Sequence, residues 1–497
     1  MTPHDDSGTM GAMEVPSAGR CLTPGSARTD GARRSTLSRR TLMALAGGAT
    51  ALAACDTVAT VRDAARGPFV AVTPTPDVHR VRVAFPRMEY YNLLRTRVLA
   101  AAKKIPADRG LQIDMVPIGM AVGTPEEQVA DLPPPMPVVG TTYARRAPTY
   151  DVDLIVADPF TLPALATAGV LYDLNTLLET QRWYDPADFL TDSLRSGYVN
   201  GKLQALPLEV AVEVLWRRDP HFAAADVKVP GHGWTWDQFL DATKALRERG
   251  PHPRGQNWGV AVNAATPSLW SLAWQQGATV VSPDGGRVDL TEGGTQRAAT
   301  FLADLVQASK VAPPPTQDLP GEDAHPIPRG FLIEWRRGRR GIPTGAALGG
   351  DFVGGPFTSR PERDASVTAL PVTGDPRVLA MPLIMLAIPR NTPDLRRSLR
   401  ALQALFEAAS ETMLSPRRQT LDLLRGVELA LKPDEGEVLL ASLRRAAYLP
   451  GGFPLLALPA LHTGFILPVL SGTVSPLRAA QDARLGIETA IRAARTA

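Results

Sequence analysis

Two acidic side chains stand inside a stretch that is otherwise apolar. Residues 206–216 read LPLEVAVEVLW, and Glu209 and Glu213 are the charged residues in this run. Side chains four residues apart lie on one face of a β-strand, and a buried carboxylate must be paired or functional. A functional carboxylate would accept hydrogen bonds from the hydroxyls of a polar solute. A structural one would form an ion pair with Arg217 or Arg218. We select Glu209 as the candidate binding residue.

Other candidates follow the ends of predicted strands. Glu89 and Tyr91 come after residues 80–85, Asp158 comes after residues 151–157, and Asp351 follows two glycines that let backbone approach a ligand closely. Loops at the carboxyl ends of strands are where open α/β sheets bind ligands. The structural alternatives are a first-turn helix acid for Glu89, a core position for Tyr91, a helix cap for Asp158 and a plain loop acid for Asp351.

Two tryptophans add aromatic faces of the kind that stack on sugar rings. Trp270 and Trp274 are four residues apart and share one face of a predicted helix. Core packing is the alternative for both residues, and we favour it for Trp274. We take Trp270 as the candidate binding residue.

The sequence lacks the motifs of the common enzyme classes. It contains no G-x-S-x-G, no H-E-x-x-H, no Walker loop and no G-x-G-x-x-G that opens a helix. Its seven histidines are scattered without metal-ligand spacing. We therefore expect no enzyme activity, no cofactor and no metal. A glycosidase that uses Glu209 and Glu213 as its acid pair stays as a less favoured alternative.

Composition excludes several further classes. The 497 residues include 53 Lys and Arg against 50 Asp and Glu, so the net charge of +3 predicts no nucleic-acid partner. The content of 44% hydrophobic and 21% charged residues is typical of a globular protein, and the length is too great for one core. The two cysteines, Cys21 and Cys55, cannot form a disulfide framework.

The amino-terminal residues have the pattern of an export signal. Residues 1–34 are polar and predict a disordered leader, Arg39 and Arg40 follow, and an apolar run extends from Thr41 to Ala54. The run is too short to span a membrane. Cys55 directly follows Leu-Ala-Ala, which resembles the cleavage and acylation site of bacterial lipoproteins, and the paired arginines resemble a twin-arginine export motif. Residues 55–77 would then be a lipidated tether.

The remaining pattern predicts alternating strands and helices. Strands are expected at 80–85, 111–116, 151–157, 210–216, 257–262, 341–348 and 378–388, and helices at 92–104, 162–168, 269–276, 295–308, 393–409 and 476–495. Asn200-Gly201 predicts a hairpin turn, and Thr235 with Gln238 predicts a helix capping box. This order is typical of an α/β protein with a largely parallel sheet in two lobes that the chain crosses more than once.

Six segments in order resemble the extracellular solute-binding proteins of family 1, the receptors of ABC importers that include maltose-binding protein. They are residues 150–178 (YDVDLIVADPFTLPALATAGVLYDLNTLL), 198–219 (YVNGKLQALPLEVAVEVLWRRD), 235–239 (TWDQF), 270–277 (WSLAWQQG), 386–391 (LAIPRN) and 474–480 (VSPLRAA). The resemblance covers roughly residues 80–497. The sequence departs from the family at Gly349-Gly350-Asp351-Phe352, where an aromatic often follows Gly-Pro, and in its aromatic content of 6%.

The resemblance implies an α/β, two-lobed periplasmic-binding-protein fold of type II, with mixed sheets flanked by helices and a ligand cleft between the lobes. Lobe 1 would comprise residues 78–208 and 346–414, and lobe 2 residues 209–345 and 415–497. The crossings would lie near 207–213, 343–350 and 410–418. In such proteins the positions of Asp158 and Trp270 often contact ligand, and His462 falls where an aromatic is presented.

The implied function is capture of a small solute, with a sugar or oligosaccharide as the expected class, and delivery to the transmembrane subunits of an ABC permease. The protein would be an extracytoplasmic monomer, anchored to the cell membrane through Cys55. The alternative is a lipid-anchored sensor or adaptor of the same fold that binds a protein partner or a non-carbohydrate ligand.

Overall fold

The computed structural model describes residues 79–87, 89–119, 136–190, 192–231, 233–250, 259–260, 267–312, 352–356, 365–419, 432, 434–449 and 457–496. The chain divides into two units, Met1–Thr75 and Pro76–Ala497. All described residues belong to the second unit. Within them, no helix has both the length and the apolar character that a membrane span requires.

One sheet organises the second unit. Its strands follow the order β2 (Leu111–Gly119), β1 (His79–Arg87), β3 (Leu154–Ala157), β9 (Val378–Ala387), β6 (Leu206–Arg218) and β7 (Phe352–Pro356). β8 (Ala365–Thr368) also pairs with β6, and β10 (Ala446–Tyr448) also pairs with β9. β1 is parallel to β2 and to β3, whereas β9 is antiparallel to both β3 and β6. The sheet is therefore mixed, and its parallel part is the β2–β1–β3 portion.

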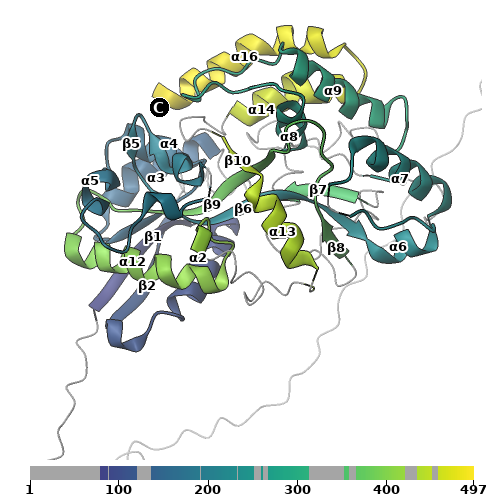
Figure 1. The fold of residues 1–497 in the computed structure, drawn as a ribbon. Helices are drawn as coiled ribbons and strands as arrows, with labels where there is room; N and C mark the ends of the chain where they lie inside the picture. The colour runs from purple at the N-terminus through teal and green to yellow at the C-terminus, as the bar shows by residue number, and fades with distance from the viewer. Residues whose placement is uncertain are drawn as a thin grey trace, which may run out of the picture. The chain divides into compact units, whose positions relative to one another are not determined.

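The two long strands β6 and β9 connect different parts of the sheet. Residues 206–212 of β6 pair with β9, and residues 213–218 pair with β7 and β8. The β6–β9 register shifts on either side of Glu209, which marks a β-bulge there. Figure 1 shows both strands passing through the middle of the unit.

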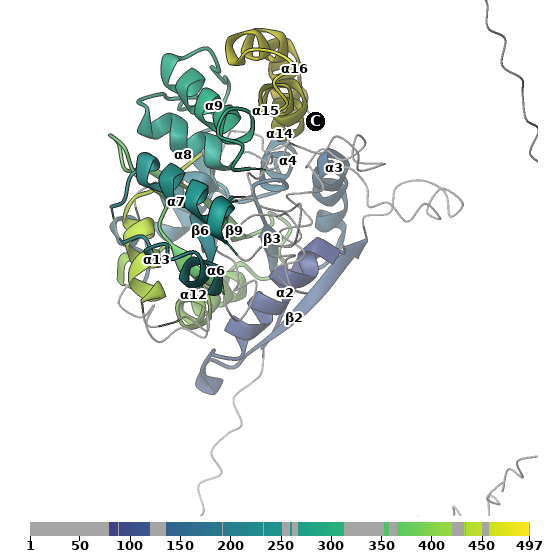
Figure 2. The ribbon, with the colours of Figure 1, turned by 90° about the vertical axis from the view of Figure 1, so that its right-hand side faces the viewer.

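Helices cover both faces of this sheet. α12 (Leu395–Thr412) packs on α2 (Glu89–Ala102) and on β1, and α3 (Met136–Arg146) packs on α4 (Leu162–Thr167). α8 (Pro267–Gln275) packs on α9 (Gly293–Val306) and on β9, and α13 (Glu435–Arg444) packs on β6 and β8. α16 (Pro476–Thr496) packs on α4 and α9 and on a helical segment formed by α14 (Leu458–Leu461), the π-helix η8 (His462–Ile466) and α15 (Leu467–Leu470). Figures 1 and 2 show these helices from two directions.

The remaining described elements are short, except for one helix. They are η1 (Ala107–Arg109), η3 (Ala147–Thr149), α5 (Leu174–Leu178), η4 (Pro186–Asp188), η5 (Ser193–Gly197), β4 (Tyr198–Val199), β5 (Lys202–Leu203) and α6 (Asp219–Ala224), together with the longer α7 (Trp236–Arg249).

Local signals in the sequence correspond closely to these elements. Asn200 and Gly201 have φ values of 52° and 75°, as a two-residue hairpin turn between β4 and β5 requires. Thr235 and Gln238 form the predicted capping box of α7. The strand predicted at 151–157 begins only at Leu154, because Asp153 is buried and accepts hydrogen bonds from the Arg82 backbone amide and the Arg397 side chain. Two predicted strands, 257–262 and 341–348, lie wholly or mostly outside the described residues.

Candidate functional site

Among the described strands, none pairs with one edge of a short interval of β9. β6 occupies one edge of β9 from Ala380 to Leu386, while β10 pairs with residues 378–380 and β3 with residues 385–387. Because Ala380 and Leu386 each pair with β6 as well, β10 and β3 must lie on the opposite edge. Between them the residues Met381–Ile384, which we call the β9 interval, pair with β6 alone among the described strands.

The carboxyl ends of two strands face each other across this interval. β3 runs antiparallel to β9 and stops beside Met385, whereas β10 runs parallel to β9 and stops beside Ala380. Both strands therefore point toward the β9 interval. Ligands of open α/β sheets bind outside the carboxyl ends of strands, at points where the strand order changes. The β9 interval is thus the candidate site that the topology defines.

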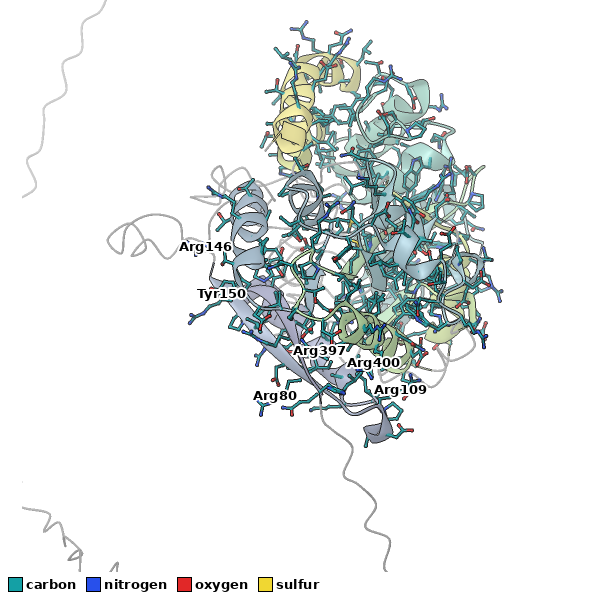
Figure 3. All side chains as sticks on the ribbon, turned by 90° about the vertical axis from the view of Figure 1, so that its left-hand side faces the viewer. Arg80, Arg109, Arg146, Tyr150, Arg397 and Arg400 are labelled. Atoms are coloured by element: carbon teal, nitrogen blue, oxygen red, sulfur yellow. The ribbon has the colours of Figure 1, made fainter. Side chains whose placement is uncertain are left out.

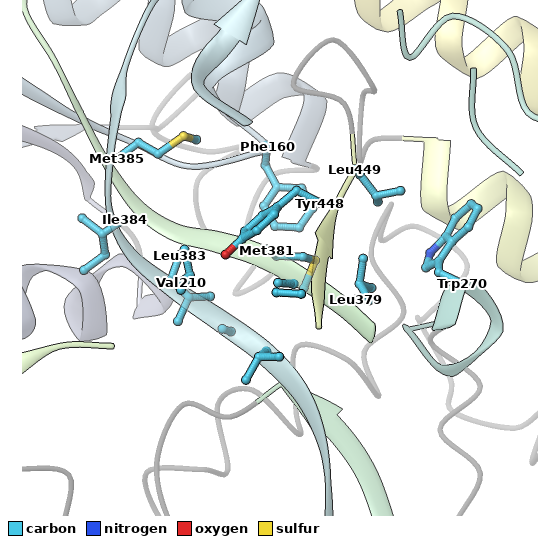
Figure 4. Close-up of a cluster of buried hydrophobic side chains, with 14 of the residues drawn as sticks. Phe160, Val210, Trp270, Leu379, Met381, Leu383, Ile384, Met385, Tyr448 and Leu449 are labelled. Atoms are coloured by element: carbon cyan, nitrogen blue, oxygen red, sulfur yellow. The ribbon is translucent and has the colours of Figure 1, made fainter. Parts of the chain in front are cut away.

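Apolar and aromatic side chains gather around the interval (Figure 4). Phe160 lies in the turn after β3, Tyr448 is the last residue of β10, and Met381 belongs to the interval itself. These three side chains are 4%, 9% and 8% exposed and belong to the main hydrophobic cluster. Trp270 of α8 is also part of this cluster. The interval therefore lies in apolar surroundings that include aromatic side chains.

Two buried polar atoms next to the interval have no hydrogen-bond partner within the described part of the chain. The Tyr448 hydroxyl has no hydrogen-bond partner, and burial raises the pKa of this phenol. The Oε2 atom of Glu209 also has no hydrogen-bond partner among the described residues. Glu209 pairs with Ile384 of the interval through the strand backbone. Buried polar atoms are seldom left without a partner. Such atoms could accept or donate hydrogen bonds to a polar ligand.

Glu209 is also part of an ion pair that the sequence did not suggest. Its other oxygen, Oε1, accepts a hydrogen bond from Nη1 of Arg97 on α2. The side chain of Glu209 is 1% exposed and that of Arg97 14%. The structural alternative named Arg217 and Arg218, but Arg217 bonds to Asp219 and to the Val367 carbonyl. Arg97 holds Glu209 at the β-bulge and leaves one oxygen for a further partner.

Asp158 and Tyr91 lie together in the core. The Tyr91 hydroxyl donates to Oδ2 of Asp158 at 2.9 Å, while Oδ1 accepts bonds from the Thr161 amide and hydroxyl, both at 2.8 Å, and from the Phe160 amide at 3.1 Å. Burial raises the pKa of the Asp158 carboxyl above its ordinary value, although these hydrogen bonds oppose the shift. Both side chains are fully buried. Asp158 therefore shapes the turn that carries Phe160, and its role in ligand contact stays a prediction.

Glu213 and Trp270 lie on the side of the interval that α8 covers. Ser271 of α8 donates its hydroxyl to Oε2 of Glu213 and accepts the Leu379 amide of β9 at 2.8 Å. Trp270 is 1% exposed. Trp274 is buried at 5%, which agrees with the core role that we favoured for it. Through these two hydrogen bonds, Ser271 joins α8 to both β6 and β9.

Several predicted site residues fall outside the described part. Glu89 begins α2, but its side chain is not described, and Asp351, Cys55, Arg39 and Arg40 lie outside the described residues altogether. Sequence reasoning missed Phe160, Tyr448 and Arg97. Phe160 could have been found, because it lies two residues after Asp158, in the turn that follows β3. Tyr448 carried no signal, because β10 has only three residues.

Comparison with known proteins supports the resemblance found in the sequence. Residues 143–327 match the family model described as bacterial extracellular solute-binding protein, a family of non-enzymatic binding proteins. No curated protein matches. The fold matches that of a Thermotoga lettingae ABC transporter solute-binding protein bound with α-D-tagatose, with a TM-score of 0.58, 16% identity, and coverage of 84% of this chain and 100% of that one.

Two further solved structures have the same fold. A Listeria monocytogenes ABC substrate-binding protein in complex with cycloalternan matches with a TM-score of 0.59 and 17% identity over 84% of this chain and 100% of that one. The cyclic α-maltosyl-1,6-maltose binding protein of Arthrobacter globiformis matches with a TM-score of 0.59 and 15% identity, over 84% of this chain and 99% of that one. The predicted fold class, the two-lobed periplasmic-binding fold with a mixed sheet, is confirmed.

Proposed function

We propose that this chain, which has the fold of the extracellular solute-binding proteins, captures a small solute at the β9 interval and delivers it to the permease of an ABC importer. The observation that carries the proposal is the pair of strand ends, β3 and β10, that converge on the interval, in a chain whose residues 143–327 match the solute-binding family. The chemistry is recognition, with no bond made or broken.

The proposed solute is a sugar or oligosaccharide. In support, similar folds are described with α-D-tagatose, cycloalternan and maltose. The aromatic rings of Phe160 and Tyr448 suit the C–H faces of a sugar. The Tyr448 hydroxyl and Oε2 of Glu209, which have no partner among the described residues, would form hydrogen bonds with sugar hydroxyls.

We further propose that β6 and β9 connect two lobes that close on the solute. β7 and β8 pair with β6 beyond Val212, and β3 pairs with β9 beyond Ile384. This pairing favours placing residues 352–356 and 365–368 with lobe 2, and it favours a return of the chain to lobe 1 within β9. The crossing that the sequence suggests at 343–350 lies outside the described residues. Solute that prefers the closed form would shift the open–closed equilibrium toward it.

The chain is also proposed to be an extracytoplasmic lipoprotein. The match to an extracellular family supports the location, and the support for the anchor is the placement of Cys55 after Leu-Ala-Ala and an apolar run. The tether of residues 55–77 would leave the folded unit close to the membrane and within reach of a permease.

A thermal-shift screen against sugars, polyols and phosphodiesters tests the function. A solute at 100 times its dissociation constant should stabilise the fold by about 2.7 kcal/mol. Tyr448→Phe removes only the hydroxyl, so it should weaken the affinity for the solute by roughly fivefold or more, the loss of one hydrogen bond of about 1 kcal/mol. It should not lower the melting temperature of the unliganded protein.

Tyr150→Phe is the matched control. It makes the same chemical change in the segment that precedes β3, at the end of this strand away from the interval. Its affinity for the solute should equal that of the parent protein. Failure of every sugar, polyol and phosphodiester to stabilise the fold would contradict the proposed function and favour the adaptor alternative.

A further inference from the structure

The helix α2 contacts both of the acids that lie on either side of Ile384, the last residue of the β9 interval. Asp158 directly follows the last β3 residue that pairs with β9, and by continuation of that register it lies beside Ile384. Glu209 of β6 pairs with Ile384 from the other edge. The Tyr91 hydroxyl donates to Asp158, and Arg97 donates to Glu209. One helix therefore fixes side chains at both edges of the interval.

The contact between Arg97 and Glu209 is a buried ion pair. The side chain of Glu209 is 1% exposed and that of Arg97 is 14% exposed. Figure 3 shows Arg80 and Arg109 at one edge of the unit, where they pair with acids while 75% and 44% exposed. Water screens exposed pairs, whereas removing one partner of a buried pair leaves an uncompensated charge. The loss of Arg97 would therefore change the electrostatics next to the interval.

The two carboxylate oxygens of Glu209 have different surroundings. Oε1 accepts the hydrogen bond from Nη1 of Arg97, and Oε2 has no hydrogen-bond partner among the described residues. Because the ion pair restricts rotation of the carboxylate, it also fixes the direction of Oε2. A neighbouring positive charge favours the ionised form of a buried carboxyl, and the ionised form only accepts hydrogen bonds. Arg97 thus keeps Oε2 in place as an acceptor.

From these contacts we infer that Arg97 is a positioning residue for the solute and determines its selectivity by charge. Arg97 would hold Oε2 of Glu209 where a solute hydroxyl donates to it, and its own positive charge would disfavour a cationic group there. The inference rests on the proposed function, because it concerns the solute captured at the β9 interval. It adds the class of solute, which is an uncharged polyhydroxylated molecule. An ammonium in place of one hydroxyl would lose its hydration without a matching gain.

Matched pairs of a sugar and its amino sugar test the inference in the full chain. D-glucose with D-glucosamine, and D-galactose with D-galactosamine, each differ by one hydroxyl replaced by an amine, which is protonated at about pH 6. The concentration dependence of the thermal shift gives each affinity. The parent protein should bind the neutral member more tightly. Arg97→Met removes the charge but keeps an unbranched side chain, and it should shift the ratio of the two affinities toward the amino sugar by about tenfold or more.

Two further variants separate positioning from a role in folding alone. Arg97→Lys restores the positive charge and should return the affinity ratio toward that of the parent protein. Arg109→Met is the matched control, because it removes an arginine from an exposed ion pair with Glu407, and it should leave both affinities unchanged. A role in folding alone would lower both affinities equally. An unchanged ratio in Arg97→Met would therefore overturn the inference.

A double-mutant cycle with Arg97→Met and Glu209→Gln needs no solute. Removing one partner leaves a buried charge or an unpaired group, whereas removing both does not. The unfolding equilibrium constant of the double variant should therefore be smaller, by about tenfold or more, than the two single changes predict together. The same cycle with Arg109→Met and Glu407→Gln should be close to additive, because that pair is exposed.

The two measurements distinguish failure of the inference from failure of the proposed function. Additive losses at Arg97 and Glu209 would overturn the inference, whether or not sugars stabilise the fold. Strong coupling between Arg97 and Glu209, together with no stabilisation by any sugar, would contradict the proposed function and with it the assigned class of solute.

Discussion

At the scale of single residues, the acids chosen from the sequence have different roles. Asp158 accepts four hydrogen bonds and uses both of its oxygens on the chain itself. Glu209 has one oxygen on Arg97 and one without a partner in the described part of the chain. A carboxylate with one oxygen still available to accept a hydrogen bond is the better candidate for ligand contact, because ligand binding then breaks no internal hydrogen bond.

Replacing Asp158 should therefore cost stability. Asp158→Ala removes the carboxylate that accepts hydrogen bonds from the Tyr91 hydroxyl, the Thr161 hydroxyl and the Phe160 amide in the core, so the free energy of unfolding should fall by about 3 kcal/mol or more. Urea denaturation measures this change in the free energy of unfolding. Asp151→Ala removes an exposed aspartate, 3.4 Å from Arg82, and should cost less than about 1 kcal/mol. Equal losses in the two variants would show that Asp158 does not organise the turn.

At the scale of elements, polar contacts attach strands and helices to β6 at several points. Arg97 joins α2 to the bulge at Glu209, and Ser271 joins α8 to Glu213 and to β9. At the far end of β6, Asp219 bonds to Arg217 at 2.8 Å and to Lys432 at 3.1 Å, and it accepts the Ser366 hydroxyl of β8. Each contact joins segments that are distant in the sequence, or it fixes the end of β6.

The Asp219 contacts should make stability depend on pH. Burial alone would raise the pKa of Asp219, but the Ser366 hydroxyl, Arg217 and Lys432 outweigh it and lower the pKa below its usual 3.8. The folded protein thus holds the carboxylate charged more strongly than the unfolded chain does. This contribution to stability is present above pH 3.8 and is lost as the pH falls through the lower folded pKa.

Asp219→Asn should consequently lower the free energy of unfolding by about 1 kcal/mol near neutral pH, a value that allows for the partial exposure of the side chain. The loss should shrink in acid, where the parent protein has lost the same contribution. Denaturation of both proteins across the acid range tests this, with Asp237→Asn on the exposed surface of α7 as the control. A loss that stays constant with pH would contradict the assignment.

At the scale of the whole molecule, the proposed anchor and the proposed solute site belong to different parts of the chain. Cys55 would hold the chain at the membrane. The β9 interval lies in the folded unit, at the carboxyl end of β3.

Cys55→Ser should release the protein from the membrane. Metabolic labelling with a fatty acid should mark the parent chain and not this variant, and cell fractionation should move the variant to the soluble fraction. Cys21→Ser is the matched control, because its thiol lies upstream of the predicted cleavage point and should leave labelling unchanged. Acylation that persists in Cys55→Ser would refute the anchor.

The sequence by itself determined the local features and indicated the fold. The turn at Asn200-Gly201, the capping box at Thr235 and most strand and helix positions follow from preferences of neighbouring residues, which act over a few positions. The order of six such segments was enough to indicate the solute-binding fold. It also selected Asp158, which directly follows β3, and Glu209, which lies at the β-bulge opposite Ile384.

Only the tertiary structure decided which groups meet. Periodicity shows that a strand is buried but does not show which strands lie beside it, because strand neighbours are set by pairings between distant segments. Thus β9 separates β3 from β6 in antiparallel orientation, Tyr448 comes to the edge of the β9 interval, and Arg97 neutralises Glu209 from 112 residues away. The nearby Arg217 and Arg218 fit the sequence equally well as partners for that acid, and long-range packing excluded Arg217 by bonding it elsewhere.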